Sequence, residues 1–543
     1  LKDESQAVQL IYSLLNELEI KSKNCDVEAI KEILPWFGLN ALTHFLTPHG
    51  LEQFGGAAWG TRDVSQGPFD LLLSMGKYEE ARKLLLTIFS NQHAHGGWPQ
   101  WWMFDSYSKI RANEAHGDIY YWVIIATAQY VSVTGDLTVF EEVLPYFSEG
   151  TDNQQHTSLK EHLDRLINMI IDSFIPETCL VPFGGGDWND SLQPVSQDLA
   201  MRLISSWTVQ MNYQAFREIT EVYRKLEDWS MTRNLESVTE RIKQDFNKHL
   251  VKDGVVAGYG LVESDGSISV LLHPTDSLTG ISYSLLPMDR GVLSGIFNSQ
   301  QAKNHQQLIE NHLKGPDGAR LMDRPLKYKG GIQEIFQRAE SSTFFGREIG
   351  IMYVHEHIRY AESQAVTGNA DAFVKALRQA NPVAYQDVVK MGDLRQSNCY
   401  YSSSDVAFSN RYAADHHYQD VLDGKMTLRG GWRVYSSGPG IYIGLVVQRL
   451  FGIRRTHEHL IIDPVMPFNF NGLEVKMRLL EHLVLFRYHI VNRNFSPAKI
   501  CLNGIELGFT VGENPYRTGG AVLLATSIRK MLKESENQFD IWL

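Results

Sequence analysis

Helix–glycine–helix segments recur along the chain, and this recurrence constrains the fold more than any other feature. Gly76, Gly135 and Gly368 each follow a stretch of near-helical apolar spacing and precede another. Glycine just past a helix readily adopts the left-handed conformation that ends it, after which an antiparallel helix can begin. Each segment therefore predicts a helical hairpin.

Repeated helical hairpins either stack into an open solenoid or close into a double-layered ring. The repeat here is loose, and the loops between hairpins are long and rich in Gly, Trp and Asp. These features favour a closed α/α barrel with a site built from loops at one end. Apolar periodicity predicts helices over 69–89, 119–133, 159–174, 199–226, 306–313, 349–366 and 441–451.

The pattern changes near Gly452. From His459 onward, short apolar runs and apolar–polar alternation predict strands, and Asn503-Gly504 is a strong hairpin-turn signal. We therefore expect a mainly α protein with a helical segment at 1–45, a closed α/α barrel at 46–455 and a small C-terminal β-rich module at 456–543.

Charge and cysteine usage exclude several classes. The net charge of -12 over 543 residues repels phosphate backbones, so nucleic acid is not an expected partner. No apolar stretch approaches the ~20 residues of a membrane span, and no secretory signal is visible at the start. The 4 cysteines are far apart and form no CxxC pair, which fits a reducing cytoplasm.

Three pairs of nearby histidines could suggest a metal: His93 with His95, His355 with His357, and His416 with His417. Positions i and i+2 of a helix point to different sides, and the H-E-x-x-H motif is absent. We therefore expect no metal site.

The string 183–190, Phe-Gly-Gly-Gly-Asp-Trp-Asn-Asp, is the most informative local feature. Three glycines allow sharp bending, and an indole and three polar side chains then follow directly. A general acid in a sugar site needs a carboxyl beside a ring that excludes water, and Asp190 near Trp188 would suit. Alternatively, the Asp and Asn residues cap the start of a helix.

Two other loops have a similar composition. The stretch 55–63 ends in the pair Arg62–Asp63, and 96–102 contains Trp101 and is followed by His116-Gly117-Asp118. Arginine and carboxylate together could bind vicinal hydroxyls, and tryptophan could stack on a sugar face. The alternatives are an ordinary ion pair and core packing.

Five strings carry a family resemblance: Gly60-Thr-Arg-Asp63, Gln100-Trp-Trp102, Gly117-Asp118, Asp187-Trp-Asn-Asp190, and Leu450–Ile453 leading to Ile462–Pro467. From about residue 40 onward the chain resembles the inverting phosphorylases of glycoside hydrolase family 94. The resemblance implies an (α/α)6 barrel, a C-terminal β-module and a large N-terminal β-sandwich domain that this chain lacks. The segment 1–45 then resembles the linker after that domain. Both a monomer and a homodimer are compatible with the resemblance.

The resemblance also implies roles for single residues. Asp190 corresponds to the general acid; the predicted substrate-binding residues are Arg62, Asp63, Trp101, Asp118 and Trp188. Phosphate would be held by Ser437, Gly438 and either His355 or Tyr353. No arginine stands at the family's usual place, here 47–49, and Arg338 or Arg347 could replace it; Arg347 could instead pair with Glu348.

The strings 336–340, 345–350 and 435–440 resemble 1,2-β-oligoglucan phosphorylases most. The implied reaction is inverting phosphorolysis of a β-linked gluco-oligosaccharide to α-glucose 1-phosphate, with inorganic phosphate as co-substrate and no cofactor. Two alternatives remain: an inverting hydrolase with Asp190 as acid and a carboxylate such as Glu340 as base, and a non-catalytic glycan-binding protein.

Overall fold

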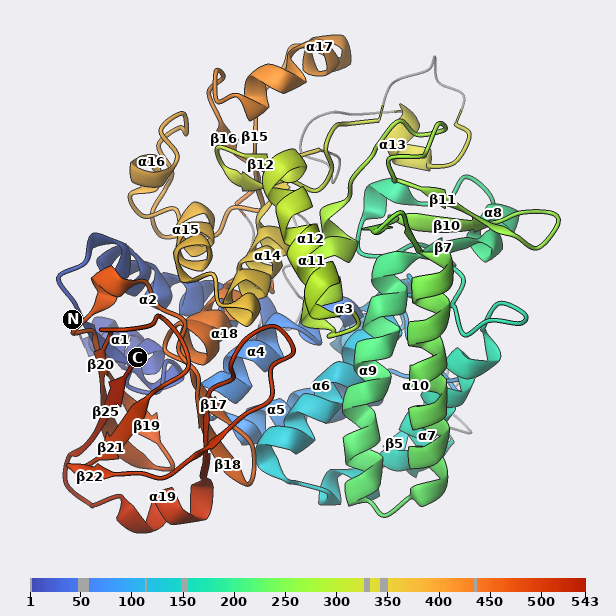
Figure 1. Cartoon of the computed structure of the whole chain (residues 1–543). Helices are drawn as coiled ribbons and strands as arrows, with labels where there is room; N and C mark the ends of the chain where they lie inside the picture. The colour runs from blue at the N-terminus through green and yellow to red at the C-terminus, as the bar shows by residue number, and fades with distance from the viewer. Residues whose placement is uncertain are drawn as a thin grey trace.

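A computed structural model describes residues 2–46, 58–112, 115–147, 155–326, 333–341, 350–433 and 437–543. A mainly helical region is followed by a β-rich C-terminal region, and both chain ends lie beside the latter (Figure 1). The α-helices are α1 (Lys2–Leu14), α2 (Cys25–Leu46), α3 (Thr61–Val64), α4 (Gly67–Ser74), α5 (Tyr78–Phe89), α6 (Ile119–Thr134), α7 (Leu159–Asp172), α8 (Gln197–Arg202), α9 (Ser206–Lys225), α10 (Trp229–His249), α11 (Leu285–Leu293), α12 (Ser299–Leu308), α13 (Gln337–Ser341), α14 (Val354–Thr367), α15 (Ala370–Ala380), α16 (Tyr385–Val388), α17 (Arg411–Leu422), α18 (Gly438–Leu445) and α19 (Ala525–Met531).

Two of the three expected hairpins form. Gly76 lies between α4 and α5 with φ 70°, and Gly368 ends α14 before α15 with φ 87°. Gly135 also ends its helix in the left-handed region. The prediction of an amphipathic helix after Gly135 is wrong, because only a 3-10 turn follows. Asp136 accepts hydrogen bonds from the backbone and the hydroxyl of Thr138 and favours this turn.

The expected continuous helix over 199–226 is also wrong. The strand β7 (Leu203–Ser205) interrupts it and pairs with β10 (Tyr259–Val262), which pairs in turn with β11 (Ile268–Leu271). The Ser205 side chain accepts a hydrogen bond from the backbone of Thr208 and caps the helix that follows. The apolar residues of β7 had continued the helical spacing.

Three further helices differ at their ends. Residues 309–313 and 446–450 form π-turns after α12 and α18. The helix α14 begins at Val354, later than expected, because β14 (Met352–Tyr353) pairs with β15 (Ser403–Asp405), which pairs with β16 (Arg429–Gly430). Each change leaves the adjoining helix in place.

Six helices of the helical region each pack on two others of the six. Helix α4 packs on α18, α18 on α14, α14 on α11, α11 on α9, α9 on α6, and α6 on α4. Most of α6 is buried over its whole circumference, from Ile119 to Val131, as expected for a helix between layers. The long helices α9 and α10 lie side by side (Figure 1).

Two sheets form the C-terminal region. One has the order β17-β18-β24-β23 and the other β1-β19-β20-β25-β21-β22. The hairpin expected at Asn503-Gly504 is confirmed, with φ values of 52° and 81°. The strands are β1 (Glu19–Lys21), β17 (Ile453–Arg455), β18 (His459–Ile462), β19 (Glu474–Leu479), β20 (His482–His489), β21 (Lys499–Leu502), β22 (Ile505–Glu506), β23 (Thr510–Val511), β24 (Ala521–Leu524) and β25 (Asn537–Trp542).

The strand β1 comes from the N-terminal segment. Its register with β19 is antiparallel, with Ile20 opposite Val475. Residues 1–45 therefore contribute a strand to the C-terminal sheet in addition to helices.

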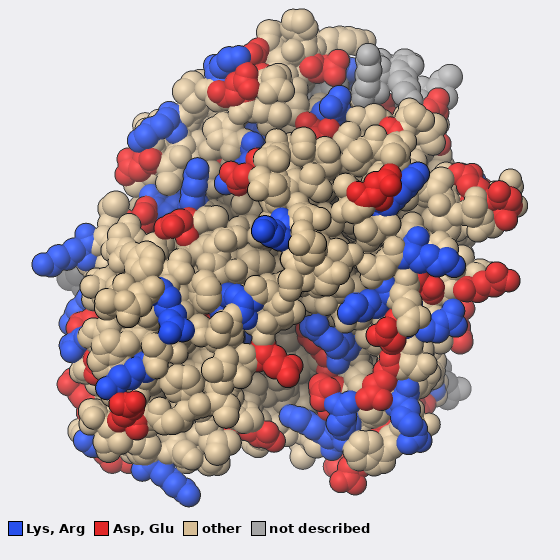
Figure 2. Space-filling view, in the orientation of Figure 1, with Lys and Arg blue, Asp and Glu red and all other residues tan. Residues whose placement is uncertain are grey.

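Charges are mixed on the surface. Among the described residues on the face in Figure 2, Lys and Arg alternate with Asp and Glu rather than gathering into one patch. In the described part of the chain, no helix is long and apolar enough to cross a membrane.

Candidate active site

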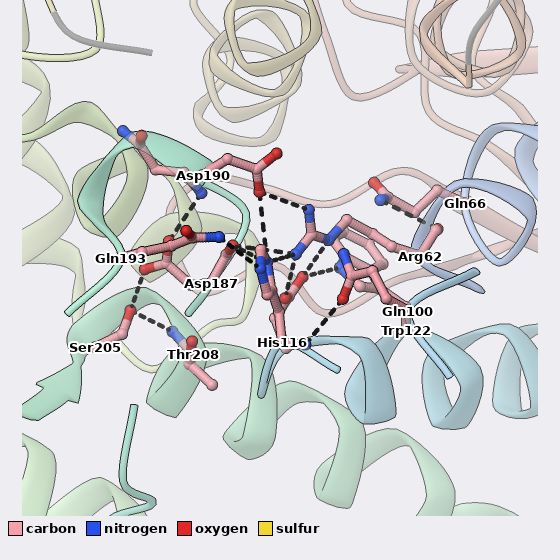
Figure 3. A network of polar contacts seen from close by, with 12 residues as sticks. Arg62, Gln66, Gln100, His116, Trp122, Asp187, Asp190, Gln193, Ser205 and Thr208 are labelled. Carbon is pink, nitrogen blue, oxygen red and sulfur yellow. Dashed lines mark hydrogen bonds and ion pairs between the residues drawn. The ribbon is translucent and has the colours of Figure 1, made fainter. Parts of the chain in front are cut away.

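The glycine run at 184–186 wraps around the loop that precedes α6. Gly184 and Gly186 have φ values of 60° and 137°, which glycine adopts at little cost. The carbonyl of Gly186 accepts a 2.9 Å hydrogen bond from the backbone of Gly117, and His116 pairs with Gly184 in an isolated bridge. This wrapping brings Arg62, His116 and the 187–193 segment together (Figure 3).

Asp187 anchors the segment that follows the glycines. Its Oδ2 accepts hydrogen bonds from Ser205 (2.8 Å) and Tyr259 (3.0 Å), and its Oδ1 accepts one from the Asn189 backbone. Burial raises the pKa of Asp187 to about 6, although the hydrogen bonds from Ser205 and Asn189 oppose that shift. Ser205 and Tyr259 are direct partners across β7 and β10, a pairing that sequence reasoning missed.

Arg62 is buried at the centre of this network. Its Nε and Nη2 donate to the Oδ2 and Oδ1 of Asp118 at 2.7 and 2.6 Å. Burial alone would lower the pKa of Arg62, but the attraction of Asp118 and Asp190 raises it above its ordinary value. Asp118 is fully buried and also accepts a hydrogen bond from Trp122. Asp118 therefore acts on the site by holding Arg62.

Asp190 lies at the open edge of the network. Its Oδ1 is 3.9 Å from Nη1 of Arg62 and 3.4 Å from Nδ1 of His116, and no described residue makes a hydrogen bond to it. Its side chain is 32% exposed. The capping alternative applies to its neighbour, because the side chain of Asn189 accepts from the Ser191 backbone at the start of a 3-10 turn.

Aromatic contacts connect this loop with the start of α18. The rings of Trp188 and His355 stack with centroids 5.6 Å apart, and Tyr353 meets Trp188 edge-on at 4.9 Å. His355 Nε2 is 3.2 Å from the hydroxyl oxygen of Ser437. Burial, together with Arg359 and Arg62, lowers the pKa of His355 to about 3, so this histidine is neutral. Four predicted site residues thus lie in one cluster, and Trp188 connects it along the chain to Asp190.

The glycines of α18 allow two close approaches. A Cβ on Gly438 would lie 2.4 Å from the hydroxyl of Tyr400, and one on Gly440 would lie 2.2 Å from the carbonyl oxygen of Gly67. Gly67 begins α4, shortly after Arg62. This helix crossing fixes Ser437 and Gly438 beside the segment that carries Arg62.

The remaining predicted residues are less tightly placed. Asp63 is half-buried, and Trp101 is half-buried on β3 (Trp101–Trp102), which lies between β2 (Trp59–Gly60) and β4 (Arg111–Ala112). Arg338 is exposed on α13. Arg347 lies outside the described residues.

The two histidines of the 355–357 pair contact different parts of the structure. His357 accepts a hydrogen bond from the Ala319 backbone and contacts the Ala376 carbonyl, so it faces away from the Trp188–His355 stack. Within the described ranges, no three His, Cys, Asp or Glu side chains converge as metal ligands.

Comparison with known proteins follows the same division of the chain. The family model of the glycosyl hydrolase 94 superfamily catalytic domain matches residues 13–418, and that of the glycoside phosphorylase C-terminal domain matches 452–542. A 1,2-beta-oligoglucan phosphorylase from Listeria innocua is 38% identical over 94% of this chain and 46% of its own. A cyclic beta-(1,2)-glucan synthase from Rhizobium meliloti is 22% identical over 78% of this chain and 14% of its own.

A solved structure shares the fold. The crystal structure of a GH78 family rhamnosidase from Bacillus sp. GL1 has a TM-score of 0.51 at 11% identity, over 87% of this chain and 42% of that one. The chain thus spans less than half the length of each of these proteins. The first family model covers well over half of the chain. This protein therefore belongs to the glycosyl hydrolase 94 superfamily.

Proposed function

We propose that this chain carries the catalytic site of a phosphorylase that cleaves β-linked gluco-oligosaccharides with inversion and releases α-glucose 1-phosphate. Family membership supports the reaction class. The observation that carries the proposal is the Asp190 carboxyl. It is partly exposed, its Oδ1 has no hydrogen bond from the described part of the chain, and it is connected through Trp188 and His355 to Ser437. In this proposal the acid and the phosphate-binding residues lie on the same side of the helical region.

In the proposed reaction, protonated Asp190 donates its proton to the glycosidic oxygen while the bond to the anomeric carbon breaks. Phosphate attacks that carbon from the opposite face, and the configuration inverts. Arg62, Asp63, Trp101 and Trp188 bind the donor sugar, and Asp118 holds Arg62. Phosphate is already an anionic nucleophile, so no second carboxylate is needed to activate water.

Phosphate is proposed to bind at Ser437 and Gly438. The neutral ring of His355 supplies a hydrogen-bonding group there rather than a charge. Tyr353 is the other candidate from the same helix start. The charge would come from Arg338 or Arg347, because Arg62 is already committed to Asp118.

The hydrolase alternative loses its candidate base. The carboxylate of Glu340 accepts hydrogen bonds from the backbone N–H groups of Glu334, Ile335 and Phe336 at 2.5 to 2.9 Å. Glu340 thereby fixes the loop before α13. A carboxylate bound in this way is poorly placed to take a proton from water.

The substrate is proposed to be a β-1,2-linked glucan. Two relatives named for 1,2-β-oligoglucan and cyclic β-(1,2)-glucan support that linkage.

We further propose that the six helices that pack on one another, α4, α6, α9, α11, α14 and α18, form the inner ring of a closed (α/α)6 barrel. Further proposals are a cytoplasmic location and an additional N-terminal β-sandwich domain, and fractionation of cells would test the location.

The test incubates the chain with inorganic phosphate and β-1,2-, β-1,3- and β-1,4-linked gluco-oligosaccharides. Sugar 1-phosphate is measured enzymatically, and its anomeric configuration is assigned by NMR. We expect α-glucose 1-phosphate from the β-1,2-linked substrate, only when phosphate is present. Release of free glucose at the same rate without phosphate would favour the hydrolase, and binding without turnover would favour the glycan-binding protein.

A further inference from the structure

His116 lies in the segment before α6 and packs against the loop at 184–193 that carries Asp190. Its side chain is almost completely buried, and the glycine run covers it: a Cβ on Gly186 would lie 3.4 Å from the ring. The backbone of His116 donates to the side chain of Gln100 at 2.9 Å. Ring and backbone are therefore both fixed (Figure 3).

The contacts of Nδ1 determine which ring nitrogen carries the proton. Nδ1 is 2.8 Å from the carbonyl oxygen of Asp187, and a carbonyl oxygen can only accept. Without a proton on Nδ1, two lone pairs would face each other at that distance. Arg62 Nη2 lies 3.0 Å from the same nitrogen, but its two protons have acceptors in Asp118 and the Asp187 carbonyl. We therefore assign the proton to Nδ1.

The other ring nitrogen has a donor of its own. Nε2 of His116 lies 3.2 Å from the amide nitrogen of Gln193, which can donate to it. Burial and the neighbouring Arg62 lower the pKa of His116, while Asp190 and Asp118 oppose the shift. The ring is thus neutral, with its single N–H directed into the loop.

We propose that His116 is a positioning residue for the general acid, and that its Nδ1–H stabilises the Asp190 carboxylate formed during catalysis. The inference rests on the proposed function. Its basis is the 3.4 Å separation between Nδ1 and Asp190 Oδ1, an oxygen to which none of the described residues makes a hydrogen bond. The Asp187 carbonyl already accepts the Nδ1 proton, and Asp190 Oδ1 lies close enough to be a second acceptor, so a small movement of the carboxylate would let the two oxygens share this proton.

The step balances without a change in the histidine. The Asp190 proton moves to the glycosidic oxygen, whose bond to the anomeric carbon breaks with both electrons remaining on oxygen. The new carboxylate accepts the Nδ1–H hydrogen bond, and His116 keeps its proton. Arg62, 3.9 Å away through Nη1, adds a charge but no hydrogen bond at that distance.

The experiment compares His116→Asn with His116→Gln. The amide nitrogen of Asn lies about where Nδ1 lies, whereas that of Gln lies about where Nε2 lies. We expect His116→Gln to lower kcat about 10- to 100-fold, the usual effect of removing a hydrogen bond to a charged group, with little change in KM. His116→Asn should recover most of the loss.

The pH profile separates positioning from packing. Asp190, Arg62, Asp118 and Asp187 all face the ring. The two variants also differ in their contacts with the Asp187 carbonyl and with Gln193, but only the hydrogen bond to Asp190 acts directly on the proton of the acid. Losing a donor to the carboxylate should move the alkaline limb of kcat to higher pH in His116→Gln and not in His116→Asn. Equal losses in both variants, with an unmoved limb, would show that His116 only packs.

His305 provides the matched control. It lies on α12 and is buried. Its Nδ1 is close to the carbonyl of Gln301, and its Nε2 accepts a hydrogen bond from the Val256 backbone. It has no part in the proposed chemistry. Asn and Gln substitutions there should change stability without changing kcat. If the His116 variants do not fold, imidazole 15N NMR of the wild type decides: a proton on Nε2 overturns the inference. A wild type that lacks phosphorolysis would instead contradict the proposed function.

Discussion

Two glycine-rich segments meet at the site, and they use glycine for different physical reasons. In the run at 184–186, Gly184 and Gly186 have positive φ values, and the space around Gly184 is open. At 438–440 no positive φ is involved, but side chains there would overlap Tyr400 and the Gly67 backbone. The first segment needs conformational freedom, whereas the second needs the absence of a side chain.

The difference bears on chemistry as well as on packing. The first segment leads into Asp190, the proposed proton donor, and the second begins at Ser437, where we propose that phosphate binds. A change that affects one segment without the other can therefore separate proton transfer from phosphate binding.

The largest effect is expected from Asp190→Asn. Removing the general acid should lower turnover by about 10²–10⁴-fold, while oligosaccharide and phosphate still bind. Steady-state kinetics together with calorimetric binding measure both quantities. The control is Asp265→Asn, in an exposed turn that makes only local hydrogen bonds. Normal turnover of the Asp190→Asn variant would exclude Asp190 as the acid.

Gly440→Ala tests the second segment. The added methyl would overlap the backbone of Gly67, which cannot move without displacing α4. We expect a loss of about 3 kcal/mol in the free energy of unfolding, as in other overpacked cores. Urea unfolding measures it. An unchanged midpoint would mean that α4 and α18 do not approach so closely.

Gly186→Ala tests the first segment. A non-glycine residue at φ 137° is strained, and the methyl would also press on the His116 ring. We expect a cost of about 2 kcal/mol. Gly184→Ala is the matched control in the same run, with φ 60° and open space, and should cost about 1 kcal/mol. Equal costs at both positions would contradict the role assigned to the His116 contact.

The smallest effect is a pH dependence of stability that comes from Asp187, which anchors the segment after the glycine run. Because the pKa of Asp187 is raised to about 6, the folded state takes up a proton near that pH, where the unfolded state does not. Its contribution to stability therefore increases as pH falls through the folded pKa. Between about pH 6.5 and about pH 5, wild type should gain about 1 kcal/mol relative to Asp187→Asn. Comparing the two proteins cancels groups that they share, and a constant difference would contradict the raised pKa.

The sequence predicted those features that depend on nearby residues. Helical periodicity identified α6, α7 and α14, and the string 183–190 pointed to the loop in which Asp190 lies near Arg62 and His116. The partners of Asp187 were not predictable, because Ser205 and Tyr259 meet only through the pairing of two strands far apart in the chain. His116 was visible as part of a loop, but its role depends on the distances of its ring to Arg62 and Asp190.

The strand β1 has a consequence for the order in which the protein is completed. It is synthesised hundreds of residues before β19, so it must wait for its partner while the whole helical region emerges from the ribosome. Such a distant pairing closes late and slowly. Until it closes, β19 offers an open edge to other chains. We therefore expect the yield of intact protein to fall most when newly made chains are at high concentration before β1 has paired with β19.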